Sequence, residues 1–420
     1  MAERGRSVPP DWLLAPLDVG VIVAVAWLGG AIAQRLRQPR IAGEMTAVFV
    51  AALLLGGQIA EVVPGQQASG RVADLFPPAA VALVTVVGGL GLILYMLLVG
   101  ITIDPAPARD RAGAIALLAA ATFAATGALA LVVAPLLVDA GGWKPRAAGQ
   151  GAFVLALAAA LAANGLPIVA RILEDRAKQH SAVGSIVIVA ATCVTAVALI
   201  ASAVAIDGGD AAAGGRVALR VGAAVVVLAI VLVIVRRRAF ALSPAVALAV
   251  VLALAVVSGL AGERLLSTLL IGPLVVGVAV RTGGHTALVV ERALGWTVRR
   301  VGLPVFLGLA ALHTDLRELS SSVLAPVLGL TAAVIAIKLA VGYGAARIAG
   351  FATADARAIS ALLQCGGIMT IAISLDELGA RVIDARMHLT LTLIGLVTTI
   401  VAGPLLPPSW SPRRGHEAPP

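Results

Sequence analysis

The sequence predicts an all-α polytopic membrane protein with about thirteen transmembrane helices. Of its 420 residues, 60% are hydrophobic and only 13% are charged, and the mean hydropathy is +1.03. This balance excludes a soluble enzyme, a secreted disulfide scaffold and an intrinsically disordered protein. At roughly 20 apolar residues per span, thirteen helices would occupy about 260 residues. The apolar runs are continuous and do not alternate with polar residues, which excludes a transmembrane β-barrel.

Thirteen apolar runs follow one another along the chain. They lie at residues 16–34, 41–57, 78–102, 114–138, 151–174, 182–206, 217–235, 244–262, 266–280, 302–314, 323–348, 358–378 and 387–405. The tenth run is short, and residues 283–300 before it have the composition of an interfacial amphipathic helix. The first run lacks the small-residue exit of a cleavable signal peptide.

The basic residues predict the topology. The net charge is +9, but Lys and Arg are scattered through short loops, which is typical of membrane topology signals and not of nucleic-acid binding. One set of alternate connections holds 19 of them and the other set 11. The positive-inside rule then places the C-terminus in the cytoplasm. We expect the protein to lie in the inner (plasma) membrane of the cell. We expect an outer tail at 1–15, a transmembrane domain at 16–406 and a cytoplasmic tail at 407–420 without a regulatory domain.

Two runs contain helix-breaking residues at mid-depth. Residues 162–167 read Ala-Ala-Asn-Gly-Leu-Pro, and residues 364–367 read Gln-Cys-Gly-Gly. Broken helices in two separate parts of a polytopic chain indicate a transporter site, because half-helix ends supply partial charges at the midplane. The alternative is that Gly and Pro mark a kink or a close helix contact.

Lys338 is the one basic residue in the middle of an apolar run. A charge at that depth costs roughly 3 kcal/mol or more unless it is paired or neutralised, which favours a functional role. A snorkelling side chain is the alternative, but about ten apolar or small residues flank Lys338 on either side.

No Asp or Glu lies in the middle of a run; Asp376 and Glu377 close the twelfth. Thr and Cys inside apolar helices usually bond to the preceding turn. The two cysteines form neither a disulfide framework nor a metal-ligand set, and we expect no catalytic residues and no cofactor. The polar residues that remain as candidates for an ion or substrate pathway are Lys338, Asn164, Thr192, Cys193, Thr195, Gln364, Cys365 and Thr370.

Several segments, in order, resemble the monovalent cation:proton antiporters of the Kef-type and NapA-type (sodium/hydrogen exchanger) branch. They are residues 38–45 (QPRIAGEM), 94–100 (LYMLLVG), 165–173 (GLPIVARIL), 303–306 (LPVF), 313–316 (HTDL), 397–399 (VTT) and 403–406 (GPLL). The resemblance implies a NapA-like fold with two inverted repeats, a dimerisation domain and a core domain whose two broken helices cross. It also implies a homodimer that exchanges a monovalent cation for protons, and it aligns Lys338 with a core lysine that often pairs with the ion-site acid.

The sequence departs from this family at the ion site. Val194 and Thr195 occupy the positions of the family's one or two adjacent acids. Residues 364–367 and Thr370 replace the family's Asn-Thr-Arg-Gly and its following Glu. The resemblance therefore implies the fold, while the standard exchange mechanism does not follow from it.

Three functions remain open on the sequence alone. The first is an antiporter with an altered site, in which neutral oxygens bind Na⁺ or K⁺ and Lys338 cycles between its charged and neutral forms; such a site would also attract an anion. The second is an antiporter fold that has become a membrane-embedded enzyme or binding protein for a small hydrophobic substrate, with Lys338 as base or amine and a cysteine as nucleophile. The third is an inactive relative that acts only through assembly.

Overall fold

The computed structural model describes residues 11–36, 38–55, 76, 78–103, 105–140, 143–179, 181–238, 243–266, 271–281, 285–312 and 321–410. Within these ranges the chain is helical apart from its connections and has no strand. The helices are α1 (Asp11–Arg35), α2 (Arg40–Leu55), α4 (Pro78–Thr102), α5 (Pro105–Asp110), α6 (Ala112–Ala140), α7 (Gln150–Ala162), α8 (Leu166–Asp175), α9 (Ala182–Ile206), α10 (Ala211–Arg238), α11 (Pro244–Leu266), α12 (Ile271–Arg281), α13 (His285–Thr297), α14 (Leu303–Leu312), α15 (Ser321–Ile348), α16 (Thr353–Leu363), α17 (Gly367–Gly379) and α18 (Ala385–Leu405).

Every predicted apolar run contains helix, and nine segments of the described chain are long and apolar enough to cross a membrane. The predicted all-α polytopic class is confirmed. The motif at residues 313–316 and the outer parts of both predicted tails, 1–10 and 411–420, lie outside the described residues.

Residues 285–312 form one helical segment, whereas the sequence predicted an interfacial helix followed by a short span. α13 continues through a π-helical turn, Val298–Gly302, directly into α14. Because a π-turn disturbs the regular carbonyl ladder, a donor from another helix can bind there. The indole Nε1 of Trp27 donates to the backbone oxygen of Arg300 at 2.6 Å and ties α1 to this junction.

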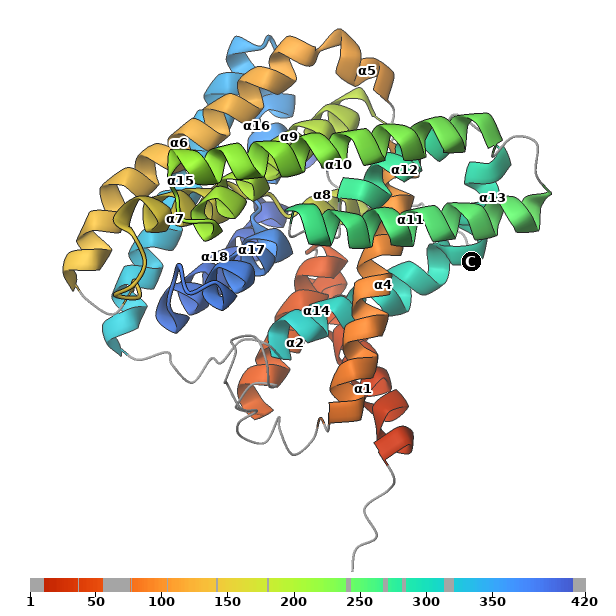
Figure 1. Cartoon of the computed structure of the whole chain (residues 1–420), viewed down its shortest axis with the longest axis horizontal. Helices are drawn as coiled ribbons and strands as arrows, with labels where there is room; N and C mark the ends of the chain where they lie inside the picture. The colour runs from red at the N-terminus through yellow and green to blue at the C-terminus, as the bar shows by residue number, and fades with distance from the viewer. Residues whose placement is uncertain are drawn as a thin grey trace, which may run out of the picture.

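The helices separate into two bundles (Figure 1). Helices α1, α2, α4 and α10 to α14 pack mainly on one another, and we call them the scaffold bundle. Helices α5 to α9 and α15 to α18 likewise pack mainly on one another and form the core bundle. The chain is thus divided into two bodies, each held together mainly by contacts among its own helices.

The core bundle is an inverted repeat. In both α6–α9 and α15–α18 a long helix precedes two half-helices and a further long helix. Ser202 near the end of α9 donates to Glu377 at the end of α17, just before α18 begins. The end of α9 therefore lies beside the start of α18, so the repeats run in opposite directions.

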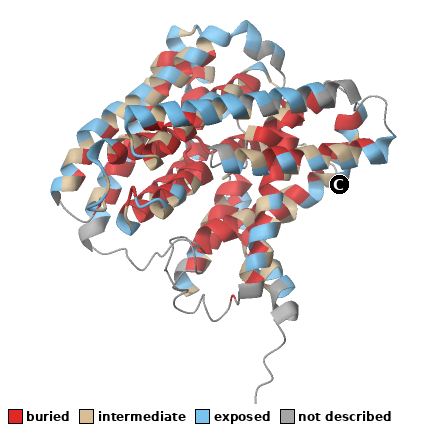
Figure 2. Cartoon of the chain, viewed as in Figure 1, coloured by how far each residue is buried: buried red, intermediate tan, exposed pale blue. Residues whose placement is uncertain are grey.

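The two interrupted segments lie in the interior. The segments Gln150–Asp175 and Thr353–Gly379 are each 89% buried, whereas the other candidate spans are 28% to 61% buried. Figure 2 shows this contrast between the interior half-helices and the exposed outer face of α10. Non-helical backbone at membrane depth is tolerated only where protein surrounds it, and this arrangement meets that requirement.

Glycines allow α4 and α12 to pack backbone against backbone. A Cβ added to Gly277 would overlap the backbone oxygen of Leu97 and lie 2.8 Å from the Cα of Gly100. Small residues at such contacts let transmembrane helices approach closely. This contact lies inside the scaffold bundle and helps to hold it as one body.

We expect Gly277→Ala to lower the stability of the scaffold by about 1–3 kcal/mol, because the methyl group must displace backbone. The matched control is Gly127→Ala in α6, where an added Cβ meets nothing within 4 Å. Thermal melting of the purified protein in detergent compares them. Equal melting temperatures for both variants would contradict the packing argument.

Candidate functional site

The two helix breaks cross at Gly165 and Gly366. Pro167 lies in the first turn of α8, and Ala163, which follows the last residue of α7, has an extended ψ of 138°. The amide of Gly165 donates to the backbone oxygen of Cys365 at 2.8 Å. A Cβ at Gly165 would lie 3.0 Å from the oxygen of Gly366, and Gly367 has φ +54°, a conformation that favours glycine. The glycines that interrupt the sequence pattern therefore permit the direct crossing.

Thr195 on α9 satisfies the backbone of the first break. Its Oγ1 accepts from the amide of Asn164 at 3.3 Å and donates to the oxygen of the same residue at 3.2 Å. Thr195 is buried, and the resemblance aligns its position with an ion-site acid of the family. At this position the chain has a neutral hydroxyl that is already bonded to backbone.

Thr398 on α18 has the same role at the second break. Its Oγ1 accepts from the amide of Gly366 at 3.1 Å, and its backbone oxygen accepts from Gln364 Nε2 at 2.9 Å. Thr195 lies thirteen residues after the first residue of α9, and Thr398 thirteen after that of α18. Sequence reasoning did not select Thr398 as a site residue, although this shared spacing could have found it.

Lys338 on α15 turns inward to the end of α7. Its Nζ lies 3.2 Å from the backbone oxygen of Leu161 and 3.3 Å from those of Ala162 and Ala163. It also lies 3.3 Å from Asn164 Oδ1. These are the last carbonyls of a helix, which carry the negative end of its dipole and have no partners within it. Lys338 is 2% exposed, and no carboxylate of the described chain forms an ion pair with it.

Two amide atoms at the crossing have no partner among the described residues. They are Asn164 Nδ2 and Gln364 Oε1, and both are buried. Because buried polar atoms are normally hydrogen-bonded, these atoms are available to a water, an ion or a rearranged partner. They come from the two different repeats.

The structure brings six of the eight candidate residues together. Lys338, Asn164, Thr195, Gln364, Cys365 and Thr370 are buried on or beside the two breaks. Thr192 and Cys193 make no hydrogen bond to the breaks in the described part of the chain. The Thr192 hydroxyl donates to Ile188 in its own helix, and Cys193 is exposed.

Charged and polar groups along α8 link the two bundles. Arg299 Nε in the scaffold lies 3.3 Å from Glu174 Oε2 of α8, and Arg171 Nη1 lies 3.0 Å from the same oxygen. The amide of Arg40 in the scaffold donates to Asp175 Oδ2 at 3.1 Å. The hydroxyl of Tyr95 in α4 donates to the oxygen of Pro167 at 3.0 Å. We call this group the α8 ion-pair cluster, and it joins one crossing helix to the scaffold.

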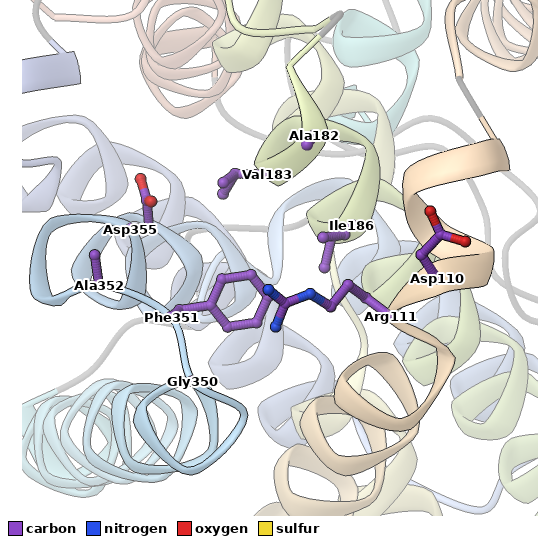
Figure 3. Close-up of a pocket in the computed structure, with 9 residues that line it drawn as sticks. All are labelled: Asp110, Arg111, Ala182, Val183, Ile186, Gly350, Phe351, Ala352 and Asp355. Carbon is purple, nitrogen blue, oxygen red and sulfur yellow. The ribbon is translucent and has the colours of Figure 1, made fainter.

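A cavity of about 360 Å³ lies at one end of the core bundle (Figure 3). It is lined by Asp110, Arg111, Ala182, Val183, Ile186, Gly350, Phe351, Ala352 and Asp355. The guanidinium of Arg111 lies 5.4 Å from the centre of the Phe351 ring and donates to the oxygen of Ala349 at 3.2 Å. All of its lining residues belong to the core bundle, so the cavity is not formed between the two bundles.

We expect Thr195→Val to destabilise the protein by about 1–2 kcal/mol, since it leaves both backbone groups of Asn164 without that partner. Thr192→Val is the matched control on the same helix and should stay within about 0.5 kcal/mol of the wild type. Thermal melting in detergent measures both. A Thr195→Val protein as stable as Thr192→Val would show that the hydroxyl does not hold the break.

Known antiporters resemble this chain, one of them over nearly its whole length. The sequence profile of the sodium/hydrogen exchanger transmembrane family matches residues 21–411. A Na⁺/H⁺ antiporter, NhaS4 of Synechocystis sp., is 24% identical over 94% of this chain and 96% of its own length. Cation/H⁺ antiporter 17 of Arabidopsis thaliana is 28% identical over 46% of this chain and 22% of its own.

A solved structure has the same fold. The sodium proton antiporter MjNhaP1 of Methanocaldococcus jannaschii superimposes with a TM-score of 0.57 over 95% of this chain and 97% of its own, at 15% identity. The predicted resemblance to cation:proton antiporters is confirmed by the profile match and these relatives. The chain belongs to the sodium/hydrogen exchanger family.

Proposed function

We propose that this protein exchanges a monovalent cation, Na⁺ or K⁺, for protons by alternating access, and that its ion site lacks the usual carboxylate. Membership of the family supports the antiporter activity. One observation supports the altered site: Lys338 Nζ contacts four oxygens at the end of α7 and the first break, where no described carboxylate pairs with it.

The proposed coupling is competition for these oxygens. When Lys338 carries its proton, the ammonium group binds the carbonyls of residues 161–163 and Asn164 Oδ1. When Lys338 releases the proton, the oxygens lose their cationic partner. Carbonyl and amide oxygens are the ligands that hard cations prefer, so a Na⁺ or K⁺ ion replaces the ammonium. Proton and cation then cannot occupy the site together, which couples their movements.

The proposed motion is a displacement of the core bundle relative to the scaffold. The contacts of Arg299 with Glu174, of the Arg40 amide with Asp175 and of Tyr95 with Pro167 cross this boundary and must break. Because α8 carries all three contacts and also follows the first break, its movement would change access to the site. The site itself, built wholly from core helices, would move as a unit.

We further propose that the protein is a homodimer in a cell's inner (plasma) membrane with its C-terminus in the cytoplasm. The homodimer is what the sequence resemblance to these antiporters implies, the match to a transmembrane exchanger family supports a membrane location, and the excess of basic residues on one set of connections supports the orientation. The proposed domain organisation is a transmembrane domain over residues 16–406.

The alternative function, a membrane-embedded enzyme or a binding protein for a small hydrophobic substrate, has less support. Cys365 Sγ lies 3.6 Å from Thr399 Oγ1, and Cys193 lies on an exposed face of α9. Neither cysteine contacts Lys338 through a hydrogen bond in the described chain.

We expect sealed proteoliposomes containing a pH-sensitive dye to lose an imposed proton gradient when Na⁺ or K⁺ is added. Lys338→Ala should reduce this flux to the level of protein-free vesicles, because the proton-carrying competitor is gone. Lys144→Ala, which changes a lysine in a loop, is the control and should transport normally. Addition of Li⁺ in the same assay tests whether the flux depends on the size of the cation.

Two results would contradict the proposal. Absence of cation-dependent flux in the wild type would reject antiport itself. Flux that persists in Lys338→Ala would keep antiport but would exclude Lys338 as the coupling group.

A further inference from the structure

Each repeat of the core ends its second half-helix with two adjacent carboxylates. α8 ends in Glu174 and Asp175, and α17 carries Asp376 and Glu377 near its end. The two pairs lie at opposite ends of the core, because the repeats are inverted. Their surroundings differ in burial and in the presence of basic partners.

The carboxylates of α8 are neutralised by arginines. Glu174 lies 3.0 Å from Arg171 Nη1 and 3.3 Å from Arg299 Nε. Asp175 lies 3.7 Å from Arg171 Nε and also accepts from the Arg40 amide. A buried carboxylate with such partners can remain charged.

Glu377 is more deeply buried and has no basic partner of this kind. Its side chain has no exposed area. Oε1 accepts from Ser202 Oγ at 2.8 Å, and Oε2 has no hydrogen-bond partner among the described residues. A carboxyl group in this setting must hold a proton or a cation, because an unpaired buried charge is strongly unfavourable.

No arginine or lysine of the described chain forms an ion pair with Glu377. Asp376 is its exposed neighbour on α17, and Glu263 of α11, which is followed by the exposed Arg264, is close enough to interact with Asp376. Arg381 lies four residues after Glu377, in the loop before α18, and its side chain is exposed. On α18, His388 Nδ1 lies 2.9 Å from the hydroxyl of Ser374, one turn before Glu377; Asp384 and the exposed Arg386 lie at the start of that helix. α9 contributes the uncharged Ser202. The charged residues of α8 lie at the other end of the core, and the described residues of α7 and α14 include no charged one.

We propose that Glu377 is a proton-binding site of this carrier, at the end of the core opposite the α8 ion-pair cluster. Glu377 takes up one proton on Oε2 and becomes a carboxylic acid, while Oε1 still accepts from Ser202. The proton comes from solvent. The role of this site in transport rests on the proposed antiport, but its protonation does not.

Infrared difference spectroscopy of the full protein in lipid tests proton binding without transport. We expect a protonated-carboxyl C=O band that disappears at alkaline pH and is absent from Glu377→Gln. The matched control Glu174→Gln should retain the band, since the carboxylate it removes is paired with arginines. Ser202→Ala should keep the band but move it to higher frequency, because a hydrogen bond to the carbonyl oxygen is lost. That shift identifies the band even if Glu377→Gln folds poorly.

Proton flux in proteoliposomes at several pH values tests the transport role. We expect Glu377→Gln to lose most of the pH dependence of flux and Glu377→Asp to restore part of it. A wild-type spectrum without a band assignable to Glu377 would overturn the proton site. A band combined with an unchanged pH profile in Glu377→Gln would overturn its place in transport. A band in a protein that moves no cation would leave the proton site standing while the antiport proposal fails.

Discussion

The structure depends on satisfying broken helix ends where water is scarce. Within a bilayer every exposed backbone group must find a partner inside the protein, and two interrupted segments at the centre create several such groups. Two threonine hydroxyls, one lysine and one direct amide-to-carbonyl bond supply the partners. The same atoms that stabilise the crossing are therefore the polar atoms from which an ion site can be built.

This constraint explains how the crossing is held without a carboxylate among its described partners. Thr195 binds both backbone groups of Asn164, and Lys338 contacts carbonyls that are left open at the end of α7. Negative charge at this point comes from a helix end and not from a carboxylate. The titratable acids are displaced to the ends of the core, where one pair is neutralised by arginines and Glu377 is not. Inverted repeats thus provide similar positions with different electrostatic surroundings.

The fold and part of the site could be predicted from the sequence for physical reasons. Long apolar runs dictate membrane helices, and Gly and Pro at mid-depth marked both breaks. The inward position of Lys338 followed from its distance to either end of its run. Contacts between distant helices could not be predicted from a single sequence. Thr192 and Thr195 are the same residue type on the same helix, but only Thr195 forms a hydrogen bond with the break. Glu377 lies at the end of a run, where sequence reasoning expects solvent, yet it is fully buried because α9 covers it.

The central claim is that a proton on Lys338 and a transported cation compete for the same oxygens. Nitrogen-15 NMR of lysine-labelled protein in lipid measures this directly, because the chain has only three lysines and the Lys338→Met spectrum identifies the third signal. At constant pH, addition of Na⁺ or K⁺ should convert the Lys338 signal from the ammonium to the neutral amine form, with no change at Lys144 or Lys178. A Lys338 signal that does not respond to either cation would contradict the account.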